Sequence, residues 1–198
     1  MEQSAKKTGK TYEMDMCSGA LFPKIVAFAV PLILSGILQL LFNAADIIVV
    51  GHFTGRESLA AVGSTTALIN LMINVFVGLS IGANVLVAQY SGAKKLKDLE
   101  ETVHTAMMIA LAGGFLLIFV GVFFSGPMLG LMGTPDDVLP LAALYLKIYF
   151  IGMPATLTYN FGAAILRAVG DTRRPLYFLL FAGAVNVVLN LVFVIVFS

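Results

Sequence analysis

The strongest constraint on the fold of this 198-residue chain is that five long stretches contain no Asp, Glu, Lys or Arg. An α-helix rises roughly 1.5 Å per residue and the hydrocarbon core of a bilayer is roughly 30 Å thick, so about 20 apolar residues are enough to cross it. Only 12% of all residues are charged, whereas a soluble domain carries about 25%. The pattern therefore predicts an all-α fold, a polytopic membrane helix bundle of about five transmembrane helices. The uncharged stretches cover residues 25–45, 58–93, 102–135, 148–166 and 175–198.

The expected organisation is a polar, cytoplasmic N-terminal segment over residues 1–22 and a transmembrane bundle over residues 23–198. The second stretch is too short for two spans and a turn, which need more than about 40 residues, so it predicts one long helix that is tilted or protrudes. The third helix is expected to stop near residue 125, because Gly126-Pro127 follows. Helices are expected at about 24–50, 58–91, 101–125, 138–166 and 175–198.

Two prolines and a glycine pair predict how these helices are shaped and packed. Pro31 and Pro154 lie inside expected helices, where each removes a backbone hydrogen bond, so we expect a kink at both. Gly78 and Gly82 are one turn apart, a spacing that lets two membrane helices approach closely. We interpret the glycine pair as a packing motif.

The basic residues predict the orientation of the bundle. Cytoplasmic loops of membrane proteins are enriched in Lys and Arg, so we expect a multi-pass protein of the plasma (cell inner) membrane with a cytoplasmic N-terminus. Lys147 does not fit simply; its ammonium group is expected to extend towards the membrane surface, with an ion pair to Asp46 as the alternative. Ten of the 12 basic residues fall on one side of the predicted bundle: Lys6, Lys7, Lys10, Lys24, Lys94, Lys95, Lys97, Arg167, Arg173 and Arg174.

Other classes of protein find little support in the sequence. The net charge is +1 and no basic patch alternates with aromatic residues, so no nucleic-acid partner is expected. The single Cys17 excludes an internal disulfide. His52 and His104 have no ligand partner at helical spacing, and no catalytic or phosphate-binding motif is present. We therefore expect no enzyme activity and no cofactor, and uphill transport would have to draw on an ion gradient or on another polypeptide.

Asp46 is the most informative polar residue because of its depth in the membrane. Four aliphatic residues, 47–50, follow it, so it should lie below the membrane surface. A carboxylate in hydrocarbon costs a few kcal/mol, and such residues usually face a bundle interior or a cavity and have a function. The alternative is that Asp46 is simply hydrated at the interface.

Asn186 and Asn190, in the last predicted helix, are candidate partners of Asp46. They are four residues apart, so their amides project from one face of the helix. With the helix entering at Pro175, Asn190 lies about 22 Å along the axis, at a depth similar to that of Asp46. One carboxylate and two amide oxygens suit a hard cation such as Na⁺, or a shared proton. The alternative is that both amides hydrogen-bond neighbouring helices.

Other polar residues are weaker candidates. Gln39 and Asn43 precede Asp46 by seven and three residues and share its helix face, so they are candidates for a substrate path. Asn84 and Asn160 are each expected to make hydrogen bonds between helices.

Several strings taken together resemble the multidrug and toxic compound extrusion (MATE) family of transporters. The similarity runs from about Lys24 to the end of the chain, and the ordered set is specific although each string alone is weak. The strings resemble the family's first helix, first outer turn, second-helix start, two inner loops and fifth-helix motif. In chain order they are residues 29–31 (AVP), 43–51 (NAADIIVVG), 59–63 (LAAVG), 88–93 (AQYSGA), 166–175 (LRAVGDTRRP) and Asn186-x-x-x-Asn190.

The resemblance implies most of one six-helix lobe of a twelve-helix antiporter that exports organic cations in exchange for Na⁺ or H⁺. It also implies a cation site formed by Asp46, Asn186 and Asn190 in the N-terminal lobe, with Asn160 as a further candidate. Some relatives carry an acid where Asn190 stands, so the choice between Na⁺ and H⁺ stays open. The expected partners are cationic drugs, the lipid bilayer and a missing C-terminal lobe, without which this fragment or truncated product should not transport.

Two other functions stay open. One is a flippase for lipid-linked precursors; such proteins often line their cavity with basic residues, and only Lys147 and Arg56 are available here. The other is a membrane scaffold or assembly subunit that transports nothing. Binding of labelled Na⁺ or of a cationic dye would separate the scaffold from the antiporter.

Overall fold

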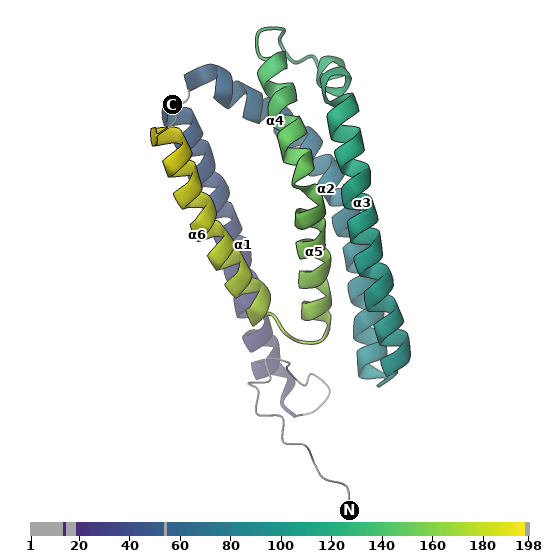
Figure 1. Ribbon diagram of the computed structural model, residues 1–198. Helices are drawn as coiled ribbons and strands as arrows, with labels where there is room; N and C mark the ends of the chain where they lie inside the picture. The colour runs from purple at the N-terminus through teal and green to yellow at the C-terminus, as the bar shows by residue number, and fades with distance from the viewer. Residues whose placement is uncertain (1–13, 15–18, 54, 197–198) are drawn as a thin grey trace, which may run out of the picture.

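The computed structural model describes residues 14, 19–53 and 55–196, and every regular element in these ranges is an α-helix. Most of the expected N-terminal segment 1–22, including Cys17, lies outside the described residues. Figure 1 shows the helices running roughly along one long axis. The prediction of an all-α fold is confirmed. The helices are α1 (Leu21–Phe53), α2 (Gly55–Gly92), α3 (Leu96–Leu131), α4 (Leu139–Ile151), α5 (Met153–Ala168) and α6 (Arg173–Val196).

Long apolar helices confirm the expected number of membrane spans. Four helices, α1, α2, α3 and α6, are long and apolar enough to cross a bilayer, and α4 with α5 makes a fifth candidate as a bent pair. Within lipid an apolar segment has to satisfy its backbone groups internally, which an α-helix does. The second uncharged stretch forms one 38-residue helix, α2, as its length predicted.

The third helix is longer than the sequence analysis predicted. α3 continues through Gly126 and Pro127 to Leu131, so the expected stop near residue 125 is wrong. A proline ring removes one hydrogen bond but does not prevent a membrane helix from continuing when its neighbours support the backbone. Gly133, two residues after the last residue of the helix, takes a φ of +74°, the left-handed conformation that commonly closes a helix.

The fourth span is broken rather than kinked. The expected kink at Pro154 is a break at Gly152, where the axes of α4 and α5 differ by 49°. Pro154 occupies the first turn of α5, where its missing N–H costs nothing and its fixed φ favours a new start. Gly114 of α3 lies against the backbone of Pro154, so a side chain at Gly114 would overlap the break.

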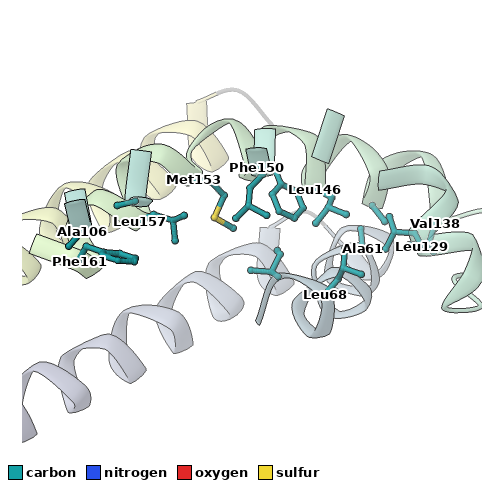
Figure 2. Packing of buried hydrophobic residues seen from close by; sticks show 14 residues of the cluster. Ala61, Leu68, Ala106, Leu129, Val138, Leu146, Phe150, Met153, Leu157 and Phe161 are labelled. Atoms are coloured by element: carbon teal, nitrogen blue, oxygen red, sulfur yellow. The ribbon is translucent and has the colours of Figure 1, made fainter. Parts of the chain in front are cut away.

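The buried apolar residues form a core between α2, α3, α4 and α5. Figure 2 shows Leu146, Phe150 and Met153 in one row, facing Ala61 and Leu68 of α2. Within the described ranges this cluster includes no residue of α1 or α6. Instead, α1 packs chiefly along α6, and Figure 1 shows the two helices side by side. The chain is therefore built from a four-helix core and an attached α1–α6 pair.

Close approaches between helices occur at glycines other than the predicted pair. A Cβ built at Gly78 or Gly82 would have no neighbouring atom within 4 Å. Among the described residues, no helix therefore approaches closely at these two glycines, contrary to what the packing motif predicted. A Cβ at Gly113 would instead overlap the ring of Phe76, and Gly121 and Gly183 are covered by aromatic rings in the same way. Each of these glycines makes room for a ring from a neighbouring helix.

Candidate functional site

The α1–α6 pair brings Asp46 and Asn190 into contact. The Nδ2 group of Asn190 donates a hydrogen bond to Oδ1 of Asp46, although the two residues are 144 positions apart. Both side chains are half-buried. A carboxylate at membrane depth is therefore held by an amide of another helix, which is how intramembrane charges are usually stabilised.

The register of α1 against α6 comes from a close contact nearby. The ring of Phe42 occupies the space that a side chain at Gly183 would need. Asp46 follows Phe42 by four residues and Asn190 follows Gly183 by seven, so each lies on the same helix face as the contact. The Phe42–Gly183 contact thus sets the level at which the carboxylate and the amide meet.

Asn186 completes a row of polar atoms on α6. Nδ2 of Asn190 lies 3.5 Å from Oδ1 of Asn186, a long contact along one face of the helix. The Asn190 amide nitrogen therefore stands between two oxygens, one from Asp46 and one from Asn186. Both oxygens accept hydrogen from the same donor, so this is a point that attracts positive charge.

The start of α6 is fixed by Asp171. Its side chain is fully buried, and Oδ1 accepts hydrogen bonds from the backbone N–H groups of Arg173 and Arg174, both at 3.1 Å. This is the capping arrangement that satisfies the free N–H groups at a helix start. The sequence offered a signal for this cap, because Asp is a usual capping residue just before a helix. The cap anchors the helix that carries Asn186 and Asn190.

The remaining predicted site residues do not join this group by hydrogen bonds in the described part of the chain. Asn160 is half-buried on α5, a helix that meets α6 over a small area. Gln39 and Asn43 lie on α1 with exposed side chains. Their roles in ion binding and in a substrate path stay predictions.

Tyr145 and Tyr149 of α4 form an aromatic pair that was not predicted. Their ring centroids lie 6.1 Å apart, one helical turn from each other. The spacing Tyr145-x-x-x-Tyr149 could have revealed an aromatic face on the fourth span. Among the described residues α4 makes no contact with α1, the helix that carries Asp46, so this pair is not part of the site.

Other polar side chains hold helices together. Nδ2 of Asn84 on α2 donates to the carbonyl oxygen of Ala164 on α5 at 2.5 Å, which confirms its expected role between helices. The hydroxyl of Tyr159 donates to the carbonyl oxygen of Pro175 at 3.2 Å. The side chain of Lys147 is exposed, and no ion pair joins it to Asp46 within the described ranges.

The searched residues contain no group of three or more His, Cys, Asp or Glu side chains suited to a metal ion. The oxygens around the Asn190 amide nitrogen belong to one carboxylate and one amide, hard ligands that suit a hard cation better than a soft transition metal.

Comparison with known proteins identifies the family. The family model MatE matches residues 31–192. The "Probable multidrug resistance protein YoeA" of Bacillus subtilis (strain 168) is 34% identical over 162 residues, covering 82% of this chain and 35% of YoeA. The "Probable multidrug resistance protein YpnP" of the same organism is 31% identical over 185 residues, covering 92% of this chain and 41% of YpnP.

A solved structure agrees with the sequence matches. The crystal structure of MATE in the bent conformation is similar at a TM-score of 0.83 and 26% identity, covering 91% of this chain and 40% of that chain. The present chain therefore spans 35% of YoeA and 41% of YpnP. The matched region includes the helices that carry Asp46, Asn186 and Asn190. The chain belongs to the MatE family, the multidrug and toxic compound extrusion transporters that its sequence resembles.

Proposed function

We propose that this chain is the N-terminal lobe region of a secondary active multidrug efflux antiporter, which exports organic cations in exchange for Na⁺ or H⁺. The lobe lies in the plasma membrane with its N-terminus in the cytoplasm, and transport requires the second lobe of the same protein. The observation that carries the proposal is the hydrogen bond from Asn190 to Asp46, an acid within a helix long and apolar enough to cross a membrane.

A cation can take the place of the Asn190 N–H donor between Asp46 and Asn186. Nδ2 of Asn190 donates to Oδ1 of Asp46 and lies near Oδ1 of Asn186. Rotation of the Asn190 amide by half a turn replaces its N–H donors with a carbonyl oxygen. The oxygens of Asp46, Asn186 and Asn190 then face one another, and a cation bound among them is held by one carboxylate and two amides. Alternatively, Asp46 itself carries the proton.

Binding at this site acts on α1, which is weakest near Pro31. Pro31 lacks the N–H that would bond one turn back, and the hydroxyl of Ser35 donates to the carbonyl oxygen of Pro31 at 2.8 Å. A serine bonded to the carbonyl four residues earlier often bends a helix. Asp46 lies beyond this weak turn on the same helix, so an ion that draws α1 towards α6 bends it there.

The test is substitution of Asp46 in the transporter that contains this lobe. Asp46→Asn keeps the size of the side chain and one acceptor oxygen for Asn190 but removes the charge. We expect efflux of a cationic dye to be abolished while the amount of protein in the membrane is unchanged. The matched control is Asp136→Asn, at an exposed acid in the α3–α4 loop, which should leave efflux intact.

Binding of labelled ²²Na⁺ to the purified protein separates the two coupling ions. If Na⁺ is the coupling ion, Asp46→Asn removes saturable binding; if H⁺ is, the wild type binds no Na⁺ and releases a proton when drug binds. Full drug resistance in cells that carry the Asp46→Asn variant would rule out the coupling role.

A further inference from the structure

A groove runs along the seam between α2 and α3, away from the Asp46 site. Its volume is about 480 Å³, and Phe161 of α5 forms part of its wall. On α2 it extends from Gly78 to Tyr90, twelve residues or about 18 Å along the axis at about 1.5 Å per residue. One leaflet of the hydrocarbon core is about 15 Å deep, half of roughly 30 Å. The length of the groove along the helix axis is therefore similar to the thickness of one leaflet.

The far end of the groove is apolar and wide. Gly78 and Gly82 form one wall, and no atom lies within 4 Å of a Cβ built at either. Ala106 and Ile109 of α3 lie opposite. The glycines that the sequence analysis interpreted as a packing motif thus leave a slot that no described side chain fills.

The other end is polar and consists mainly of hydrogen-bond acceptors. The carboxylates of Asp98 and Glu101 line it, as do Thr102 and Thr105. The hydroxyl of Thr102 donates a hydrogen bond to the backbone carbonyl oxygen of Asp98 at 2.7 Å, and that of Thr105 donates to the carbonyl oxygen of Glu101 at 2.8 Å. Their oxygens can then only accept. The groove end therefore suits a ligand with several N–H donors.

Basic groups stand beside this end without lining it. The ammonium group of Lys95 is 3.9 Å from Oδ2 of Asp98, and that of Lys97 is 4.0 Å from Oε1 of Glu101. Both pairs are exposed, so the side chains are easily rearranged. Positive and negative groups thus alternate where the α2–α3 turn leaves the membrane.

We propose that this groove binds a membrane phospholipid whose head group carries a primary ammonium ion, as phosphatidylethanolamine does. One acyl chain lies in the slot beside Gly78 and Gly82. The ammonium group donates hydrogen bonds to the carboxylates of Asp98 and Glu101, and the phosphate lies near the neighbouring lysines. A choline head group has no N–H donor and an anionic head group has no cation, so neither matches the acceptor-rich end.

Native mass spectrometry of the purified chain with added lipids tests this site. Phosphatidylethanolamine, phosphatidylcholine and phosphatidylglycerol of equal chain length are titrated separately. We expect phosphatidylethanolamine to bind roughly tenfold more tightly than either of the others, a difference of about 1.4 kcal/mol. Equal retention of all three lipids, or retention of none, overturns the proposal.

Variants locate the bound lipid in the groove. Gly82→Leu places a side chain in the slot, where the Cβ position itself is open, and it should lower retention about tenfold, or by about 1.4 kcal/mol. Gly63→Leu is the control, on the same helix, outside the groove and equally open at Cβ. Unchanged retention in Gly82→Leu shows that the lipid binds elsewhere, or that another copy or lobe covers the seam, and overturns the proposal.

The head-group contact has its own pair of variants. Asp98→Asn with Glu101→Gln should remove the preference for phosphatidylethanolamine, while Glu100→Gln, an exposed acid of the same helix that does not line the groove, should keep it. A preference that survives the double substitution contradicts the assigned contact. Circular dichroism at matched concentration verifies that each variant retains its helices.

Discussion

At the scale of single residues, the Asp46 carboxylate depends on one amide from a distant part of the chain. The hydrogen bond from Asn190 compensates part of the cost of holding a charge at membrane depth. Asn186 adds a second oxygen on the same face of α6. No further acid takes part among the described residues, so the charge of the site changes when Asp46 gains or loses one proton or cation.

If Na⁺ is the coupling ion, Asn190→Ala should weaken its binding at least roughly tenfold, because the variant lacks the Asn190 carbonyl oxygen of the proposed ion-bound arrangement and a polar contact with a charged group contributes about 1.5–3 kcal/mol. Binding of ²²Na⁺ to the purified protein measures the change. Asn74→Ala, at an exposed amide of α2, is the matched control and should bind as the wild type does. Equal affinities for both variants would remove Asn190 from the site.

At the scale of helices, glycines and caps decide which residues meet. Gly183 lets the ring of Phe42 approach α6, and this contact sets the level of Asp46 relative to Asn190. Asp171 fixes where α6 begins. Pro154 and Gly152 divide the fourth span so that α4 and α5 pack at different angles on α3.

Gly183→Leu should separate α1 from α6, because its side chain would overlap the Phe42 ring. Overpacking of this kind costs about 1–3 kcal/mol, and spin labels on the two helices should report a longer distance. Phe42→Ala in the same protein should restore much of the loss, so a double-mutant cycle gives a non-zero coupling energy. Gly36→Leu, where the Cβ position is open, should leave the distance unchanged.

Asp171→Ala should lower the stability of the protein by about 0.5–2 kcal/mol, the usual loss when a helix cap is removed. The first turn of α6 should also exchange its amide hydrogens faster, which hydrogen–deuterium exchange measures. Asp171→Asn retains a capping oxygen but loses the charge that lies 3.1 Å from Nε of Arg174, so its stability should lie between those of the alanine variant and the wild type. Unaltered exchange at Arg173 and Arg174 in the alanine variant would contradict the capping role.

At the scale of the whole molecule, the chain consists of a packed core and a more loosely attached pair. The core cluster joins α2, α3, α4 and α5, whereas α1 and α6 contact mainly each other. Figure 1 shows the pair beside the core, with the α5–α6 connection between them at one end. The proposed ion binding would therefore act on two helices that, within the described ranges, contribute no residue to the core cluster.

Phe150→Ala should destabilise the core by about 3–5 kcal/mol, the range for a buried phenylalanine. Phe150 is 0% exposed and packs against Gly121 of α3, so truncation leaves a cavity between α3 and α4. Thermal unfolding in detergent measures the effect. Phe123→Ala, at a ring 64% exposed on α3, should shift the midpoint much less.

The sequence by itself determined the class of fold and the family. The number of spans follows from the lengths of uncharged stretches, which are local properties of the chain. The depths of Asp46 and Asn190 follow from the same count, because helix rise per residue is constant. The ends of helices were less predictable. α3 continues beyond Pro127 to Leu131, and the fourth span is divided into two helices at Gly152.

Only the tertiary structure decided which helices pack together. The spacing of Gly78 and Gly82 predicted that a neighbouring helix would approach there. In the structure, the rings of distant phenylalanines lie instead against Gly113, Gly121 and Gly183. The physical reason is that packing depends on the fit between two surfaces far apart in the chain, and membrane helices lack the hydrophobic force that would mark a buried face by its polarity. For the same reason the pairing of α1 with α6 could not be derived from either helix alone.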